Sequence, residues 1–153
     1  MQFIKKGDII ALGCDHGGYQ LCNIIEEYVK EQGIEVIRYG CTDGQAIDYP
    51  EVAVKVCNSI VGGESKCGIL VCGTGIGMSI AANKVKGIRA AVCSDTFSAK
   101  FTRLHNDTNV LCLGGRVVGQ GLALEMVEIF LNTVFEGGRH QRRVDAVMDI
   151  EKY

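Results

Sequence analysis

The 153-residue sequence has no tryptophan, a single proline and no long run of hydrophobic residues. Its apolar stretches, such as residues 69–72, fall far short of the roughly 18 to 20 residues that a membrane-spanning helix needs. We therefore expect no transmembrane helix and no membrane partner. An excess of positive charge is also missing, because 16 lysines and arginines face 18 aspartates and glutamates, for a net charge of −2. A chain so balanced is not expected to bind nucleic acid, and any anion that it binds should be small.

The rest of the composition is typical of a globular protein. Hydrophobic residues make up 47% of the chain and charged residues 22%, which excludes an intrinsically disordered, collagen-like or coiled-coil protein. No linker or low-complexity segment divides the chain, so we expect one domain over residues 1–153. Residues 1–8 contain no long apolar stretch of the kind found in secretion signals, which predicts a cytoplasmic protein.

Cysteine is abundant, with eight residues, but its spacing is not that of a disulfide framework or a metal site. No pair of cysteines has the C-x-x-C spacing, and the three histidines are far apart in the sequence. We therefore predict neither a metal site nor a thioredoxin-like motif. A chain of this length can build its own hydrophobic core without cross-links. Most of the thiols are expected to be reduced core residues.

Hydrophobic runs alternate with amphipathic segments along the whole chain. Leu21, Ile24, Ile25 and Tyr28, for example, recur at helical spacing after the first hydrophobic run. Strands are predicted over residues 8–13, 35–39, 68–72, 88–93 and 110–113. Helices are predicted between these strands, then over about residues 119–135, and finally in a short segment after residue 138. Continuous hydrophobic strands that alternate with helices indicate an α/β fold, in which helices cover both faces of a five-stranded parallel sheet.

The most informative segment follows the predicted strand 68–72, because ligands of such sheets bind at the carboxyl ends of the strands. Residues 73–77 read Gly-Thr-Gly-Ile-Gly. Glycines at alternate positions allow backbone N–H groups to face an anion or a developing oxyanion. A tight turn that binds nothing is the alternative. The loop is not a Walker A motif, because no Lys-Ser/Thr pair follows, and Met78 stands where a G-x-G-x-x-G motif has its third glycine.

Cys72 is the cysteine best placed to react, because it lies at the mouth of this loop. The loop N–H groups would favour its thiolate form, whereas the alternative is a buried thiol at the end of a strand. A phosphotyrosine-phosphatase site requires an arginine six residues after the nucleophile, where this chain has Met78. A thiolate beside an oxyanion cradle but without that arginine suits proton abstraction at least as well as phosphoryl transfer.

Three further clusters of polar residues are expected at the same edge of the sheet as Cys72. They are Asp15 and His16 after the first strand, His105 and Asn106 at the end of the helix before the fifth strand, and Arg139 and Arg143 at the start of the last helix. The two arginines are four residues apart, so one helical face could present both to a phosphate. A helix cap, a helix end and a solvated basic face are the ordinary structural alternatives. The whole set suits moving a proton between two carbons beside a carbonyl group.

Six segments in order resemble the type B ribose-5-phosphate isomerase family, which includes the galactose-6-phosphate isomerase subunits. They are GCDHGG at 13–18, CGTGIG at 72–77, AANK at 81–84, GIRA at 87–90, HNDTN at 105–109 and EGGRH at 136–140. The resemblance implies a single-domain, Rossmann-like α/β/α sandwich that pairs as a homodimer, or as a dimer of dimers, with each active site built from both chains. It also implies cofactor-free interconversion of ribose 5-phosphate and ribulose 5-phosphate in the pentose phosphate pathway.

The resemblance further implies roles for individual residues. Cys72 matches the base that moves the proton between C1 and C2, and His105 matches the acid that opens the furanose ring, with Asn106 beside it on the partner chain. The loop that holds the enediolate oxygens matches Gly73, Thr74, Gly75, Ile76 and Gly77, with Thr74 also among the catalytic positions. The positions that contact the sugar match Cys14 and Asp15, with His16 beside them. The positions that bind phosphate match Arg116, Arg139 and Arg143.

Some members of the family use a glutamate base directly after the loop, where this chain has Met78, so the sequence resembles the branch that uses cysteine. Three alternatives stay open. The first is an isomerase of a six-carbon sugar phosphate, such as allose 6-phosphate or galactose 6-phosphate. The second is a nucleotide-binding or redox module in which Asp95, twenty residues after Gly75, would bind a ribose. The third is a cysteine hydrolase that forms a covalent adduct on Cys72.

Overall fold

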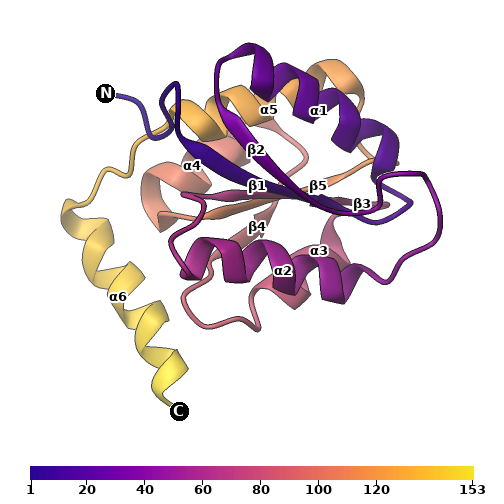
Figure 1. The fold of residues 1–153 in the computed structure, drawn as a ribbon. Coiled ribbons are helices and arrows are strands. Elements are labelled where there is room, and N and C mark those ends of the chain that lie inside the picture. The colour runs from indigo at the N-terminus through magenta and orange to yellow at the C-terminus, as the bar shows by residue number, and fades with distance from the viewer.

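Five parallel strands form the central sheet of the computed structural model, which describes residues 1–153 (Figure 1). The strands are β1 (Ile9–Cys14), β2 (Glu35–Gly40), β3 (Gly68–Cys72), β4 (Ala90–Val92) and β5 (Val110–Gly114). Their order in the sheet is β2-β1-β3-β5-β4, and every neighbouring pair is parallel. The predicted α/β fold with a five-stranded parallel sheet is therefore confirmed, and β3 is its central strand.

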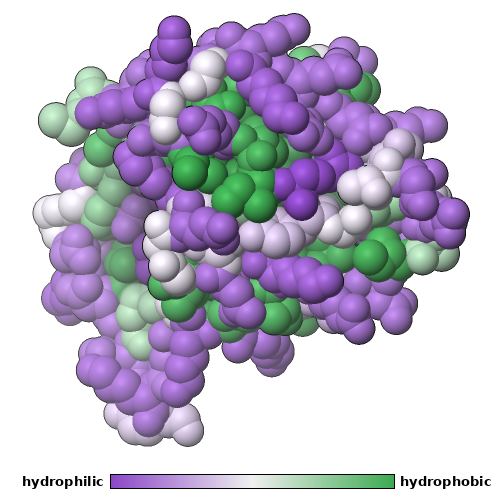
Figure 2. Space-filling view, viewed as in Figure 1, coloured by the Kyte–Doolittle hydropathy of each residue, from purple (hydrophilic) through white to green (hydrophobic).

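Helices cover both faces of the sheet (Figure 1). They are α1 (Tyr19–Glu31), α2 (Tyr49–Val61), α3 (Ile76–Ala82), α4 (Thr96–Asn106), α5 (Gln120–Asn132) and α6 (Gln141–Asp149), with 3₁₀ turns at Gly138–His140 and Ile150–Lys152. Residues of α1, α4 and α5 join one apolar cluster of 23 buried residues, and residues of α2 and α3 join a second cluster of 12 on the other face. Figure 2 shows hydrophilic side chains over most of the outer surface of these layers.

The strands with continuous hydrophobic sequence are the inner ones. Every residue of β3 and β5 is buried, and so is every residue of β1 after Ile9. The edge strands β2 and β4 are only partly buried. This pattern is expected of a parallel sheet that is covered on both faces, because only its inner strands lose all contact with water.

Some predicted boundaries are wrong. Strand β4 has three residues, where the hydrophobic run predicted residues 88–93, and α5 ends at Asn132 rather than near residue 135. The chain becomes extended at Thr133, which has ψ = 121°. Apolar residues at the ends of these segments pack without belonging to the strand or helix, so hydrophobicity alone overestimates its length.

The direction of the chain defines two edges of the sheet, which we call the carboxyl edge and the amino edge. The loops that follow the strands lie at the carboxyl edge. Each helix between parallel strands runs back across the sheet, so the segments after α4 and α5 lie at the amino edge. Helix α6 projects away from the sandwich at this amino edge (Figure 1). None of the helices combines the length and the hydrophobicity that crossing a lipid bilayer requires.

Candidate active site

The loops after β3 and β5 meet at the carboxyl edge. The N–H of Gly115 donates to the carbonyl of Cys72 at 2.8 Å, and the N–H of Arg116 donates to the carbonyl of Gly73 at 3.0 Å. These bonds extend the pairing of β3 with β5 by one step beyond the strands. They hold the backbone of Cys72 in place at the end of the central strand.

The loop after β1 approaches the same point at backbone contact distance. A Cβ atom on Gly17 would lie 2.9 Å from the nitrogen of Gly73, and one on Gly18 would lie 2.3 Å from the carbonyl oxygen of Val71. Real Cβ atoms do not come so close to other heavy atoms, so glycine is required at both positions. The carboxyl ends of β1, β3 and β5 thus form one continuous loop cluster.

Cys72 lies at the centre of this cluster, and its side chain is nearly buried, with 5% of the residue exposed. The backbone N–H of Gly75 donates to the Cys72 sulfur at 3.1 Å. Thr74 is exposed beside it, and its hydroxyl accepts a hydrogen bond from the N–H of Ile76 at 3.3 Å. An N–H group that points at the sulfur stabilises negative charge there. The geometry therefore supports Cys72 as a base at the mouth of the glycine loop.

Gly75→Ala should damage the glycine loop. Gly75 has a positive φ of 78°, and an added Cβ atom would lie 2.9 Å from the carbonyl carbon of Leu113. The left-handed conformation alone costs about 1–2 kcal/mol for a residue with a side chain, and relief of the contact would move the Gly75 N–H away from Cys72. We expect urea unfolding to give a lower free energy of unfolding. We also expect a lower kcat for the isomerase reaction that the family resemblance implies.

Gly63→Ala is the matched control, because Gly63 has a similar φ of 77° and open space around it. It should lose similar stability from backbone strain and keep its turnover. Equal turnover of the two variants would show that the position of the Gly75 N–H is unimportant.

Asp15, His16 and Arg116 lie at the same edge. The Asp15 carboxylate accepts a hydrogen bond from the N–H of Gly18 at 3.1 Å and so stabilises its own loop, while the exposed His16 accepts one from the N–H of Ile47 at 3.4 Å. His16 and Arg116 line one surface pocket of about 460 Å³. This pocket offers the imidazole and the guanidinium group to a small anion.

The structure turns the thiol of Cys14 away from Cys72. Cys14 is fully buried among residues on the α1 side of the sheet, whereas Cys72 belongs to the cluster on the other side. The Cys14 sulfur accepts a hydrogen bond from Arg38 at 3.2 Å and lies 3.4 Å from the carbonyl oxygen of Cys41. A hydrogen bond with Cys22, together with the Arg38 guanidinium, lowers the pKa of the Cys14 thiol against the opposing effect of burial. The contacts of the Cys14 thiol are therefore with other residues of the same chain.

Other cysteines behave as core residues, as predicted. All eight are free thiols. Burial raises the pKa of Cys57 and Cys67 to about 12 and that of Cys93 to about 11. These thiols stay protonated at neutral pH and are poor nucleophiles and bases.

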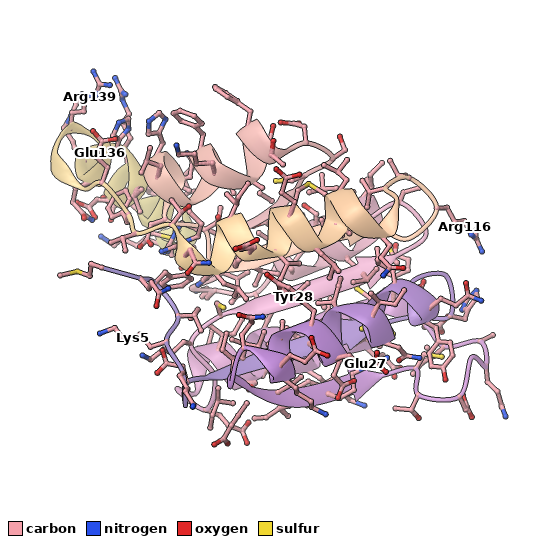
Figure 3. All side chains as sticks on the ribbon, turned by 90° about the horizontal axis from the view of Figure 1, so that it is seen from above. Lys5, Glu27, Tyr28, Arg116, Glu136 and Arg139 are labelled. Carbon is pink, nitrogen blue, oxygen red and sulfur yellow. The ribbon has the colours of Figure 1, made fainter.

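The structure overturns the expectation that His105, Asn106, Arg139 and Arg143 share an edge with Cys72. The N–H of Gly68, at the start of β3, donates to the carbonyl of Asn109 at 2.9 Å, so the end of α4 lies at the amino edge. The length of β3, about 13 Å at the usual rise per residue, separates this edge from Cys72. Figure 3 shows Arg116 at one end of the molecule, and Arg139 and Glu136 at the other.

The buried Arg103 and the half-buried Arg89 hold the end of α4 in position. Arg103, which is 2% exposed, donates to the Asp107 carboxylate at 2.8 Å. Arg89 donates to the carbonyl of Asn106 at 3.2 Å and to that of Asp107 at 2.7 Å. Asp107 has a positive φ of 46° and ends the helix. This network fixes the backbone next to His105.

The His105 ring contacts two other aromatic side chains. Its ring is stacked on that of His140, with centroids 4.0 Å apart and planes 9° apart, and it meets the ring of Phe101 edge-on at 4.8 Å. One carboxylate oxygen of Glu136 lies 3.7 Å from Nε2 of His105 and 3.8 Å from Nε2 of His140. No role for Glu136 or His140 was predicted from the sequence. The only sequence signal was the EGGRH segment, 31 residues or more beyond His105.

The side chains of His105, Glu136 and His140 lie as close together as the ligands of a metal ion, although the spacing of the histidines in the sequence predicted no metal site. The nitrogen and oxygen atoms of His105, Glu136 and His140 lie within 4.8 Å of one another. Because the two imidazole planes are nearly parallel, the in-plane lone pairs of their nitrogens run side by side rather than converging on one point. In addition, Arg139 donates its Nε–H to Nε2 of His140 at 3.3 Å. The arrangement is that of a stacked pair and does not fit a set of metal ligands.

The two arginines of the predicted phosphate fork do not both belong to the last helix. Arg139 lies in the 3₁₀ turn, after Gly137 and Gly138 with φ of 69° and 54°, whereas Arg143 lies in α6. Arg143 lines a pocket of about 310 Å³ together with Asn106. A 3₁₀ turn has three residues per turn rather than 3.6, so the four-residue spacing does not correspond to one regular α-helical face.

Asp95, the residue considered as a ribose-binding acid, is a helix cap. Its carboxylate accepts hydrogen bonds from the N–H of Ser98 at 2.7 Å and from the Ser98 hydroxyl at 2.8 Å. The bond from the Ser98 backbone also lowers the pKa of the Asp95 carboxyl. Both oxygens are thus engaged at the start of α4, which argues against the nucleotide-binding alternative.

Comparison with known proteins relates this geometry to sugar phosphate isomerases. The family model described as "Ribose/Galactose Isomerase" matches residues 10–147. Ribose-5-phosphate isomerase B of Escherichia coli is 52% identical and covers 94% of this chain and 96% of that protein. The structure of ribose-5-phosphate isomerase B from Clostridium thermocellum has a TM-score of 0.93 at 49% identity, and covers 94% of this chain and 97% of that one. The structure of ribose-5-phosphate isomerase B from Mycoplasma genitalium with bound ribulose-5-phosphate has a TM-score of 0.91 at 40% identity. It covers 95% of this chain and 97% of that one.

Proposed function

Because this chain belongs to the ribose/galactose isomerase family, we propose that it interconverts D-ribose 5-phosphate and D-ribulose 5-phosphate, a step of the pentose phosphate pathway. The observation that supports this best is the Cys72 sulfur, which ends the central strand and faces the N–H of Gly75. The reaction is redox-neutral overall, since a hydrogen moves from C2 to C1 of the same molecule. It therefore needs no oxidant or reductant, and we propose that it proceeds without a cofactor.

The proposed chemistry at the carboxyl edge is proton transfer through a cis-enediolate. The Cys72 thiolate removes the proton from C2 of the open-chain aldose, and negative charge develops on the oxygen at C1. The backbone N–H groups of residues 73–77 and the exposed Thr74 hydroxyl stabilise this charge. The hydroxyl proton at C2 moves to the oxygen at C1, and the protonated Cys72 returns its proton to C1, which gives the ketose and regenerates the thiolate.

The remaining groups are proposed to come from a second copy of the chain. Ribose 5-phosphate is mainly a furanose, so its ring must open before C2 can lose a proton. The ring-opening acid, His105, lies at the opposite edge from Cys72 in one chain. A homodimer in which each carboxyl edge meets the partner's amino edge would bring Cys72 together with the partner subunit's His105 and Asn106, twice in one symmetric assembly.

Exposed apolar side chains at both edges support such pairing. At the carboxyl edge, Ile76 is 53% exposed and Phe97 is 69% exposed, while at the amino edge Val147 of α6 is 54% exposed. Exposed apolar patches rimmed by polar residues are typical of surfaces that a partner covers. The projecting helix α6 would be such a cover (Figure 1).

The same pairing would assemble the phosphate site. Arg116 lines the pocket at the carboxyl edge, and the partner subunit's Arg139 and Arg143 would approach it from across the interface. Arginine suits this role, because its planar group forms paired hydrogen bonds with phosphate oxygens. Six-carbon sugar phosphates are the alternative substrates. They are one carbon longer and would need a deeper space between the two chains.

A proton NMR assay in D₂O tests the function. Ribose 5-phosphate with chelator-treated enzyme should give ribulose 5-phosphate with deuterium incorporated at the exchanging carbons. Product without deuterium would contradict an enediolate that exchanges its proton with solvent. If ribose 5-phosphate is inert while allose 6-phosphate or galactose 6-phosphate reacts, the six-carbon alternative is correct.

His105→Asn should separate ring opening from proton transfer. Ribulose 5-phosphate cannot close to a furanose, because its C5 oxygen carries the phosphate, so its exchange with D₂O reports only the Cys72 step. We expect kcat/KM with ribose 5-phosphate to fall by about 10²- to 10⁴-fold, the range for loss of a general acid. Exchange into ribulose 5-phosphate should stay within a few-fold. Equal losses in both assays would argue against a ring-opening role.

A further inference from the structure

We infer that His140 is a positioning residue for His105. It holds the His105 ring by stacking. Because its Nε2 accepts a hydrogen bond from Arg139, His140 does not compete with His105 for the Glu136 carboxylate. The catalytic consequence rests on the proposed function. The structural part, which concerns the proton positions on two imidazole rings, does not.

Two aromatic contacts restrict the His105 ring. The side chain of His140 is 6% exposed and that of His105 is 32% exposed. The His140 ring is therefore the buried platform, and the His105 ring is the one that solvent or a ligand can reach. Phe101 also contacts the His105 ring, edge-on at 4.8 Å. The segment that carries Glu136 is bound to α4 by a hydrogen bond from the Glu136 N–H to the carbonyl of Leu104 at 3.0 Å. The platform and the carboxylate therefore move with the helix that carries His105.

One hydrogen bond and one ion-pair contact indicate where the protons lie. A neutral imidazole has one N–H and one bare nitrogen, and an arginine N–H can only donate. Since Arg139 donates to Nε2 of His140 at 3.3 Å, that nitrogen is bare and the His140 proton is on Nδ1. His140 then has no Nε2–H to offer to Glu136. The carboxylate oxygen lies 3.7 Å from Nε2 of His105, so we place the His105 proton on that nitrogen, where it faces the carboxylate.

The charges around the pair agree with a neutral His140. Burial, and then the nearby His105, Arg139 and Arg143, lower the pKa of His140, while Glu136 acts in the opposite direction. Protonation of this ring would also break the bond from Arg139. His140 thus stays an acceptor at neutral pH.

This arrangement leaves Nδ1 of His105 for the sugar. Ring opening breaks the bond between C1 and the ring oxygen, turns the C1 hydroxyl into a carbonyl group and moves one proton from that hydroxyl to the ring oxygen. A bare Nδ1 can take the proton from the hydroxyl and pass it to the ring oxygen. The Glu136 carboxylate stabilises the imidazolium that forms in between, as a carboxylate does for the histidine of a catalytic triad.

Nitrogen-15 NMR of histidine-labelled protein at about pH 8 tests the proton positions without any sugar. We expect opposite tautomers, with Nε2–H on His105 and Nδ1–H on His140. The variants His105→Asn, His140→Gln and His16→Asn assign the three sets of signals. The same tautomer on both rings of the pair would overturn the inference.

Two substitutions of His140 test its effect on catalysis. His140→Phe keeps an aromatic platform and removes the acceptor for Arg139, whereas His140→Gln keeps an acceptor of similar reach and removes the platform. We expect each to lower kcat with ribose 5-phosphate at least about tenfold, with little change in KM and with exchange into ribulose 5-phosphate retained. Unchanged kcat in both would refute the positioning role.

Gln141→Ala is the matched control, because the neighbouring side chain is exposed and bonds only to Asp145. It should leave both the tautomers and the kinetics unchanged, and a similar loss of kcat would attribute the His140 effects to the fold of the segment. If the tautomers are as expected and ribose 5-phosphate is not converted, the proposed function fails while the pairing of the histidines stands.

Discussion

Replacement of Cys72 by serine should lower kcat with ribose 5-phosphate by about 10²- to 10⁴-fold, the usual contribution of a general base. Serine keeps the size of the side chain and an acceptor for the N–H of Gly75, which donates to the sulfur at 3.1 Å. It cannot ionise at neutral pH, so the proposed base is lost while the loop is kept. Unlike His105→Asn, this variant should also lose the exchange of ribulose 5-phosphate with D₂O, because that exchange needs the same base.

Cys67→Ala provides the control, because Cys67 lies directly before the other end of β3 and is fully buried. Burial raises its pKa to about 12, so it contributes packing and no charge. We expect this variant to lose some stability in thermal unfolding and to keep its kcat. If Cys72→Ser also kept a normal kcat, the base would have to be another group and the proposed mechanism would be wrong.

Mixing two inactive variants should restore activity. In a dimer with shared sites, a Cys72→Ser chain paired with a His105→Asn chain has one site with both defects and one site with neither. Random pairing of equal amounts makes half of the dimers mixed, so the mixture should recover about a quarter of wild-type activity. Chains that each contained a complete site would show no recovery.

The control uses two residues of the same edge. When Cys72→Ser is mixed with Arg116→Ala, every site of the mixed dimer has one defect, and the activity should not exceed the mean of the two parents. The proteins are unfolded and refolded together so that chains exchange, and activity is measured before and after. Recovery with the first pair alone would establish that Cys72 works with the partner subunit's His105. Recovery with both pairs would contradict this arrangement of the edges.

The features that could be predicted from the sequence are those that depend on neighbours along the chain. Continuous hydrophobic runs that alternate with amphipathic segments predict buried parallel strands and covering helices, and the structure confirms them. The Cys72 loop is equally local, since the N–H that reaches the sulfur is only three residues away. The cap formed by Asp95 is local in the same way, because it needs only Ser98, three residues on.

Features that depend on distant parts of the chain required the structure. The order of motifs along the chain predicts His105 and the two arginines at the edge of Cys72, but it does not take account of the direction of the helices. A helix between parallel strands returns the chain to the opposite edge, so residues at its end lie one strand length from the residues that follow the strand before it. The direction of the Cys14 side chain was likewise hidden, because it depends on which layer packs Arg38 and Cys41 against the sheet.

The sequence by itself thus determined the fold class, the family resemblance and the Cys72 loop, because each depends on residue types at fixed short spacings. Only the tertiary structure decided that the proposed base and the proposed ring-opening acid lie at opposite edges of one chain, and that His140 and Glu136 surround His105. The physical reason is that hydrophobic periodicity reports which residues are buried, whereas contacts between segments more than 30 residues apart depend on how the layers pack.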